Sequence, residues 1–279
     1  YLQKGNRMKN EKNYVDKRSG MIEREAKPRT SGINYVRAPK ILGQNFADFL
    51  NCYSALTDIV KLGTNQLTFI PEQEIKKAIQ RSHDQEVLIA VGNPIMDQAL
   101  SAGSKAAMEV INYAAGLGVD VMEISVIARA IDDEDLAELL EYIKNKGMKP
   151  LVECGLSFAH EPVVDGRTFA KRKKAQAKRA LENGAWKILV EAEGVFENVK
   201  SGEERWDFVD DFAADFEVRD LIFEADNQDV MSYFVNAYGP KVNVLIDNSQ
   251  VMQIEAARRG YGPCTLTWAK AAVFSKDGD

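Results

Sequence analysis

Six apolar segments of the chain each carry a charged or amide side chain near one end, and this recurrence constrains the fold more than any other feature of the sequence. Successive side chains of a β-strand point to opposite faces, so a polar residue inside an apolar run faces one way while its neighbours face the other. Runs that are apolar on both faces are typical of parallel strands covered by helices. The six segments are DIVKLG with Lys61, DVMEIS with Glu123, PLVEC with Glu153, KILVEA with Glu191, LIFEA with Glu224, and VNVLID with Asn243 and Asp247.

From Pro28 onward, short apolar runs alternate with amphipathic stretches, a pattern that predicts repeated strand–helix units and a parallel sheet. Eight such units can be counted, which favours a closed (β/α)8 barrel, the TIM barrel, as a single domain over residues 28–279. Residues 1–27 are rich in charge and lack apolar periodicity, so we expect a polar N-terminal extension. The predicted strands are Ile33–Arg37, Asp58–Gly63, Val87–Val91, Asp120–Ser125, Met148–Cys154, Trp186–Ala192, Leu221–Ala225 and Val242–Asp247.

The overall charge and the cysteines exclude several classes of protein. A net charge of −6 and a pI near 5.3 argue against nucleic acid as a partner. Neither a membrane span nor a signal-peptide core is visible in the sequence, so we expect a cytoplasmic protein that does not bind membranes. Separately, we expect a homo-oligomer. Cys52, Cys154 and Cys264 lack metal-ligand spacing, which argues against a zinc site or a disulfide framework.

The polar residues of the six segments should converge at one end of the barrel, where their charges need compensation. Two carboxylates about 5 Å apart repel by roughly 3 kcal/mol at an effective dielectric constant of 20. A bound cation, Lys61, Arg37 or protonation of one carboxyl group would relieve this repulsion. Carboxylate and amide oxygens without a His or Cys cluster favour Mg²⁺. In the alternative interpretation, some of these glutamates pair with neighbouring barrel residues and have only a structural role.

On this basis the predicted metal ligands are Glu153, Glu191 and Glu224. A long irregular segment over residues 155–168 follows a strand and is predicted to be a lid that brings His160 or Arg167 to the ligand. The predicted substrate-binding residues are Arg37, Asn243, Arg258, Arg259 and His160.

Taken in order, eight segments resemble the phosphosulfolactate synthase family, roughly from Lys27 to Gly260: KPRTSGINYV, TDIVKLG, VDVMEIS, LVECG, ENGAWKILVEAEG, LIFEA, GPKVNV and IEAARRG. The resemblance implies a (β/α)8 barrel that adds sulfite to phosphoenolpyruvate with Mg²⁺. It also implies an enolate stabilised by the metal and a lysine as proton donor. The positions that match the family are Lys61, Glu123, Glu153, Glu191, Glu224 and Asn243. The resemblance thus implies a small anionic substrate, with Lys61, Glu123 and Glu153 as the predicted catalytic residues.

The chain departs from the family pattern at several loops after strands. Leu156 and Ser157 follow Gly155 where the enzymes carry a lysine, and Glu193 stands where they carry an arginine. The segments VRAPKILGQNF, FEADNQ and NVLIDNSQVMQIE are similar to the plant heat-stress-associated branch of the family. We therefore expect a synthase-like, Mg²⁺-assisted lyase acting on phosphoenolpyruvate or a related acid. The alternative is a non-catalytic heat-stress-associated barrel that has lost the synthase residues.

Overall fold

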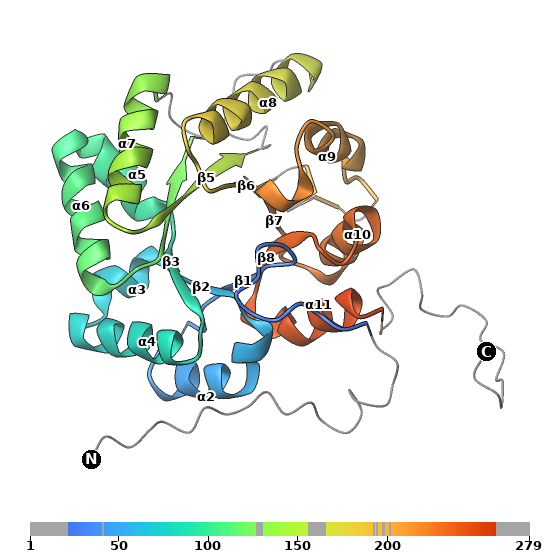
Figure 1. The fold of residues 1–279 in the computed structure, drawn as a ribbon. Coiled ribbons are helices and arrows are strands. Elements are labelled where there is room, and N and C mark those ends of the chain that lie inside the picture. Colours follow the sequence, from blue (N-terminus) through green and yellow to red (C-terminus); the bar gives the residue numbers. More distant parts are fainter. Residues whose placement is uncertain are drawn as a thin grey trace, which may run out of the picture.

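Eight parallel strands close into one barrel, with helices packed around its outside (Figure 1). Each strand pairs with the next along the chain, and β8 pairs with β1 to complete the ring. The predicted (β/α)8 fold is therefore confirmed. The computed structural model describes residues 22–260 apart from 41, 127–130, 156–165, 192, 194, 197–198 and 201.

The strands begin and end within one residue of the positions expected from the sequence. They are β1 Asn34–Arg37, β2 Ile59–Leu62, β3 Leu88–Val91, β4 Val121–Ser125, β5 Lys149–Gly155, β6 Lys187–Glu191, β7 Leu221–Glu224 and β8 Asn243–Ile246. The helices are α2 Gln44–Tyr53, α3 Thr64–Phe69, α4 Glu72–Asp84, α5 Pro94–Ala102, α6 Ser104–Leu117, α7 Asp133–Asn145, α8 Gly166–Glu182, α9 Trp206–Ala213, α10 Gln228–Tyr238 and α11 Val251–Arg258.

Local signals explain where α4 and α7 begin and end. Acidic side chains occupy the first turn of both helices, and basic side chains occupy the last turn. These charges stabilise the positive and negative ends of each helix dipole. Gly147, which follows α7, has a φ of 83°, a left-handed conformation that glycine adopts without steric cost.

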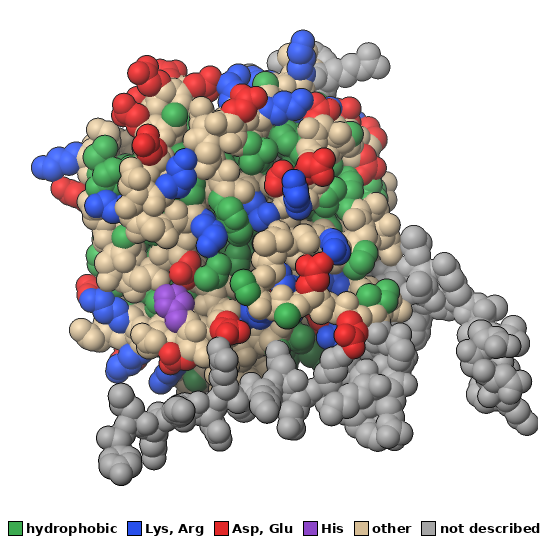
Figure 2. All heavy atoms as spheres, viewed as in Figure 1, with side chains coloured by type: hydrophobic (Ala, Val, Ile, Leu, Met, Phe, Trp, Pro, Cys, Tyr) green, Lys and Arg blue, Asp and Glu red, His purple; other side chains and the backbone are tan. Residues whose placement is uncertain are grey.

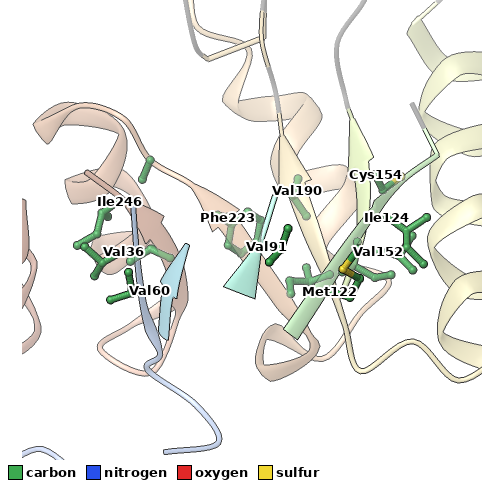
Figure 3. Packing of buried hydrophobic residues seen from close by; sticks show 14 of the residues in the cluster. Val36, Val60, Val91, Met122, Ile124, Val152, Cys154, Val190, Phe223 and Ile246 are labelled. Atoms are coloured by element: carbon green, nitrogen blue, oxygen red, sulfur yellow. The ribbon is translucent and has the colours of Figure 1, made fainter. Parts of the chain in front are cut away.

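The strand side chains form two apolar layers because they alternate between the two faces of the sheet. The outer layer packs between strands and helices and includes Val36, Val60, Val152 and Phe223 (Figure 3). The inner layer fills the barrel with Tyr35, Ile59, Ala90, Val121, Leu151, Leu189, Ile222 and Leu245. Seven of these inner-layer residues are followed, two positions later in the sequence, by a charged residue. These charged residues are Arg37, Lys61, Glu123, Glu153, Glu191, Glu224 and Asp247. Alternation therefore directs these seven toward the barrel axis, at the end of the barrel where the strands end.

Buried polar contacts connect the first and last strands at the opposite end of the barrel, where the strands begin. The Arg258 side chain is fully buried and donates hydrogen bonds to the Asn34 side chain and to the backbone oxygens of Ile33, Pro240 and Val242. These acceptors belong to β1 and to the segments that precede β1 and β8. Arg258 therefore holds the first and last strands together.

This arrangement corrects three of the substrate-binding assignments. Asn243 is the first residue of β8, and its amide donates to the backbone oxygens of Arg219 and Leu221, next to the start of β7. Arg258 and Arg259 lie at the end of α11, which has returned to the end of the barrel where the strands begin. The Asn243 side chain points into the barrel as expected, but it lies at the end where the strands begin and not at the mouth where they end. None of the three reaches the mouth that holds the carboxylates.

The segment before β1 crosses the same end of the barrel. Arg24 forms an ion pair of 2.6 Å with Glu255, and Lys27 donates to the backbone oxygens of Ser54 and Thr57 at 3.0 and 2.7 Å. Residues 22–27, which the sequence assigned to the polar extension, therefore include side chains that contact the barrel.

Acidic and basic side chains are interspersed on the face of the molecule displayed in Figure 2. None of the helices within the described part of the chain is both long enough and apolar enough to span a bilayer.

We predict that Arg258→Met lowers the free energy of unfolding by about 3 kcal/mol, because it leaves several buried carbonyl groups without a donor. Arg259→Met is the matched control, since this side chain forms a partly exposed pair with Glu255 and should contribute less than about 1 kcal/mol. Urea unfolding of the two variants measures the difference. Equal losses would contradict the structural role of Arg258.

Candidate active site at the mouth of the barrel

A buried ion pair lies at the mouth of the barrel between β2 and β4. The Lys61 Nζ atom is 2.8 Å from Glu123 Oε2, and Tyr35 donates its hydroxyl proton to Glu123 Oε1 at 2.5 Å. Glu123 and Tyr35 are fully buried, whereas the Lys61 side chain is 15% exposed. The lysine is thus the member of this group that a ligand entering the mouth can reach.

Asn93, just after β3, connects this pair to the next glutamate. Its backbone N–H donates to Glu123 Oε2 at 3.0 Å, and its side-chain amide donates to Glu153 Oε2. Gly92 lies close to the ion pair, because a Cβ atom at that position would stand 3.0 Å from Lys61 Cε and 3.6 Å from Glu123 Oε2. A glycine here leaves room for the lysine to reach its partner.

Three further carboxylates gather beside this group. Carboxylate oxygens of Glu153, Glu191 and Glu224 all lie within 4.8 Å of one another. Burial, assisted by the negative charges of Glu123 and Glu191, raises the pKa of Glu153 to about 8. The structure therefore brings together the three glutamates that the sequence predicted to be metal ligands; we call them the carboxylate trio.

Arg37, at the end of β1, compensates part of this negative charge. Its guanidinium forms ion pairs with Glu224 and with Asp226, and its side chain is 28% exposed. Arg37 thus links the carboxylate trio to the loop that follows β7.

The carboxylate trio fits a divalent cation by its chemistry. Its donors are oxygens, which Mg²⁺ and Mn²⁺ prefer, and it contains no softer His or Cys ligand. A bound cation would also offset the repulsion that raises the pKa of Glu153. Mg²⁺ at this site stays a prediction.

Some predicted site residues lie outside the described residues, and others were missed. His160 and most of the predicted lid fall in the range 156–165, and the side chain of Arg167 is likewise not described. Sequence reasoning did not single out Tyr35 or Asn93, although Tyr35 was detectable because it stands two residues before Arg37 on the same face of β1. Asn93 lies in a loop, where alternation carries no information.

Residues 22–262 match the (2R)-phospho-3-sulfolactate synthase (ComA) family. The chain belongs to this family. The expected resemblance is therefore confirmed, over nearly the same range of residues.

Characterised relatives of this phosphosulfolactate synthase family member are distant. The chain is 25% identical over 257 residues to protein HEAT-STRESS-ASSOCIATED 32 of Arabidopsis thaliana, which covers 85% of this chain and 88% of the relative. It is 24% identical to phosphosulfolactate synthase of Methanocaldococcus jannaschii, over 76% of this chain and 85% of the relative. It is 25% identical to phosphosulfolactate synthase of Bacillus subtilis, over 85% of this chain and 93% of the relative.

Solved structures show the same fold at lower identity. The 3-hexulose-6-phosphate synthase of Salmonella typhimurium superposes with a TM-score of 0.56 at 13% identity, covering 81% of this chain and 98% of that one. A 3-dehydroquinate dehydratase from Aquifex aeolicus superposes with a TM-score of 0.51 at 15% identity, covering 80% and 97%. These similarities concern the barrel alone.

The raised pKa of Glu153 predicts how the stability of the metal-free protein depends on pH. Between the ordinary value of 4.5 and about 8, the folded protein holds a proton that the unfolded chain has released. The free energy of unfolding should therefore fall as pH rises through this interval. Denaturant unfolding with a chelator present measures the slope, which Glu153→Gln should reduce.

Glu138→Gln is the matched control, because Glu138 is exposed on α7 and its removal should leave the slope unchanged. The interpretation is contradicted if Glu153→Gln and Glu138→Gln keep the same slope as the unaltered protein.

Proposed function

We propose that the mouth of the barrel catalyses a metal-assisted addition of a small nucleophile, such as sulfite, to phosphoenolpyruvate or a related small anionic acid. The observation that carries this proposal is the carboxylate trio lying beside the Lys61–Glu123 ion pair. Membership of the phosphosulfolactate synthase family supports the same reaction class.

Glu153, Glu191 and Glu224 would hold the metal ion through their carboxylate oxygens. When bound there, Mg²⁺ would supply positive charge to the carboxylate of the acid and so stabilise the negative charge that builds up during the addition. The protein contributes a partly desolvated site, since Glu153 and Glu224 are buried.

Lys61 is the side chain best placed to deliver the proton that the addition requires. The nucleophile forms a bond to one carbon of the double bond, and the other carbon must take up a proton. Glu123 forms an ion pair with Lys61 and holds its amine at the mouth, and Tyr35 and the Asn93 N–H fix Glu123 in place. After donating a proton, the partly exposed lysine can recover one from solvent.

Arg37 would bind the anionic substrate. Its guanidinium pairs with Glu224 and Asp226, and its side chain is partly exposed. Because Glu224 would also be a metal ligand, Arg37 would lose part of that pairing in the loaded site. Its guanidinium could then pair with a carboxylate or phosphate group of the substrate.

Glu193 would disfavour the binding of a phosphate group at the same mouth. It stands two residues beyond Glu191, where the synthases carry an arginine, and it adds a negative charge in place of a positive one. We therefore expect phosphoenolpyruvate to be a poor substrate, and a related acid that carries less negative charge to be a better one.

The second candidate function is that of a non-catalytic heat-stress-associated protein that retains the barrel. The match to the Arabidopsis protein, which spans 85% of this chain, favours this alternative. Under it, the mouth would bind a cation or an anion without turnover. A cytoplasmic location, a homo-oligomeric state and the lack of a nucleic-acid partner stay predictions from the sequence.

An assay with phosphoenolpyruvate, sulfite and Mg²⁺, followed by phosphorus NMR, tests the proposal. We predict slow, Mg²⁺-dependent formation of a sulfonated product, faster in Glu193→Arg. Lys61→Met should lower kcat at least about 100-fold, because it removes the proton donor. Lys76→Met removes an exposed lysine of α4 and should leave the rate unchanged.

Product formation that is independent of metal, or that survives Lys61→Met, would overturn the proposed roles. Mg²⁺ binding in calorimetry, combined with no turnover by either the unaltered protein or Glu193→Arg, would favour the non-catalytic alternative.

A further inference from the structure

A cavity of about 490 Å³ lies at the end of the barrel where the strands begin, opposite the carboxylate trio. Its inner wall includes Ile33, Ile59 and Leu88, which pack on the apolar layer that fills the barrel. The segment from Lys27 to Thr30 forms part of its rim. We call this space the basal cavity. Its volume is within the range of small-molecule sites.

The basal cavity is lined by more positive than negative charge. Four basic residues, Lys27, Arg29, Lys149 and Lys187, face two carboxylates, Asp58 and Glu86. Arg29 is already paired with Asp58 at 2.9 Å. The three lysines are therefore left with one carboxylate among the lining residues.

Two of these lysines are held by backbone carbonyl groups rather than by carboxylates. Lys27 Nζ donates to the backbone oxygens of Ser54 and Thr57, and Lys187 Nζ donates to those of Thr30 and Arg219. Among the described residues, neither ammonium forms an ion pair. Carbonyl oxygens satisfy hydrogen bonds but do not neutralise a full charge. Asp58 and Glu86 near Lys27, and Asp220 near Lys187, compensate these charges only in part, because burial outweighs their effect on both lysines.

Burial makes these charges costly in the absence of an anion. Desolvation lowers the pKa of Lys27 to about 8 and also lowers the pKa of Lys187. An anion inside the basal cavity would stabilise the charged form of both lysines.

An aromatic ring stands beside the ammonium groups. Lys187 Nζ lies 5.2 Å and Lys149 Nζ 5.8 Å from the centre of the Trp186 ring, which also lines the basal cavity. The ring and the aliphatic wall provide an apolar surface for a flat molecule, and the lysines provide charge at its edge.

We propose that the basal cavity binds a small organic anion with a flat apolar body, such as an aromatic carboxylate. The apolar wall would contact the body of the ligand, and the lysines around Trp186 would pair with its carboxylate. This site lies at the other end of the barrel from the carboxylate trio, so it is separate from the proposed reaction and does not depend on it.

Calorimetric titration of the full chain with 2-naphthoate tests the proposal, with uncharged 2-naphthalenemethanol as the comparison ligand. We predict saturable binding of 2-naphthoate and binding of the alcohol that is at least about tenfold weaker, because the alcohol lacks the charge that the lysines complement. Lys149→Met should weaken the binding of 2-naphthoate about fivefold. Lys149 is exposed, so this change should leave folding intact.

Lys146→Met is the matched control, since Lys146 also lies over an aromatic ring, 5.1 Å from the Tyr142 centroid, but outside the basal cavity. It should leave binding unchanged. Leu88→Trp places a larger side chain in the cavity and should abolish binding while the circular dichroism spectrum stays native.

Absence of 2-naphthoate binding at millimolar concentration, equal binding of the alcohol, or equal effects of Lys149→Met and Lys146→Met would overturn the proposal. Undiminished binding by folded Leu88→Trp would also overturn it, because the ligand would then lie elsewhere.

Discussion

Electrostatic repulsion among the glutamates at the mouth of the barrel is the constraint on which the arrangement around them depends. Carboxylates within 4.8 Å of one another repel by about 3 kcal/mol per pair at an effective dielectric constant of 20. This repulsion is relieved in different ways at different glutamates. Lys61 compensates Glu123, Arg37 compensates Glu224, and Glu153 has a raised pKa. Glu153 is therefore the carboxyl group whose charge state a bound cation would change most.

The two ends of the barrel carry opposite charge and serve different physical roles. At the mouth, buried carboxylates outnumber the cations near them, whereas the basal cavity has lysines that are held only by backbone carbonyl groups. The apolar inner layer, from Tyr35 to Leu245, separates the two ends. This separation would allow the proposed cation site and the proposed anion site to coexist in one small domain without neutralising each other.

The sequence predicted the barrel and the convergence of the glutamates because both follow from alternation along strands. Glu123, Glu153, Glu191 and Glu224 each stand two residues beyond an inner-layer residue, so their direction was readable from the sequence. Alternation states which face a side chain occupies but not which end of the barrel it reaches. Asn243 was assigned to the mouth from its direction, although it is the second residue of the predicted strand Val242–Asp247. Arg258 was misplaced because a helix carries it back to the start of the strands, and Asn93 was missed because it lies in a loop.

The proposed chemistry at the mouth requires that Glu153, Glu191 and Glu224 form a divalent-cation site. Anomalous diffraction from crystals grown with Mn²⁺ tests this claim most directly, because Mn²⁺ accepts the same oxygen ligands as Mg²⁺ and is identified by its own scattering. We predict one strong anomalous peak among the three carboxylates, with Arg37 displaced from Glu224. A fully occupied Mn²⁺ elsewhere, with the three carboxylates unbound and Arg37 still paired to Glu224, would contradict it.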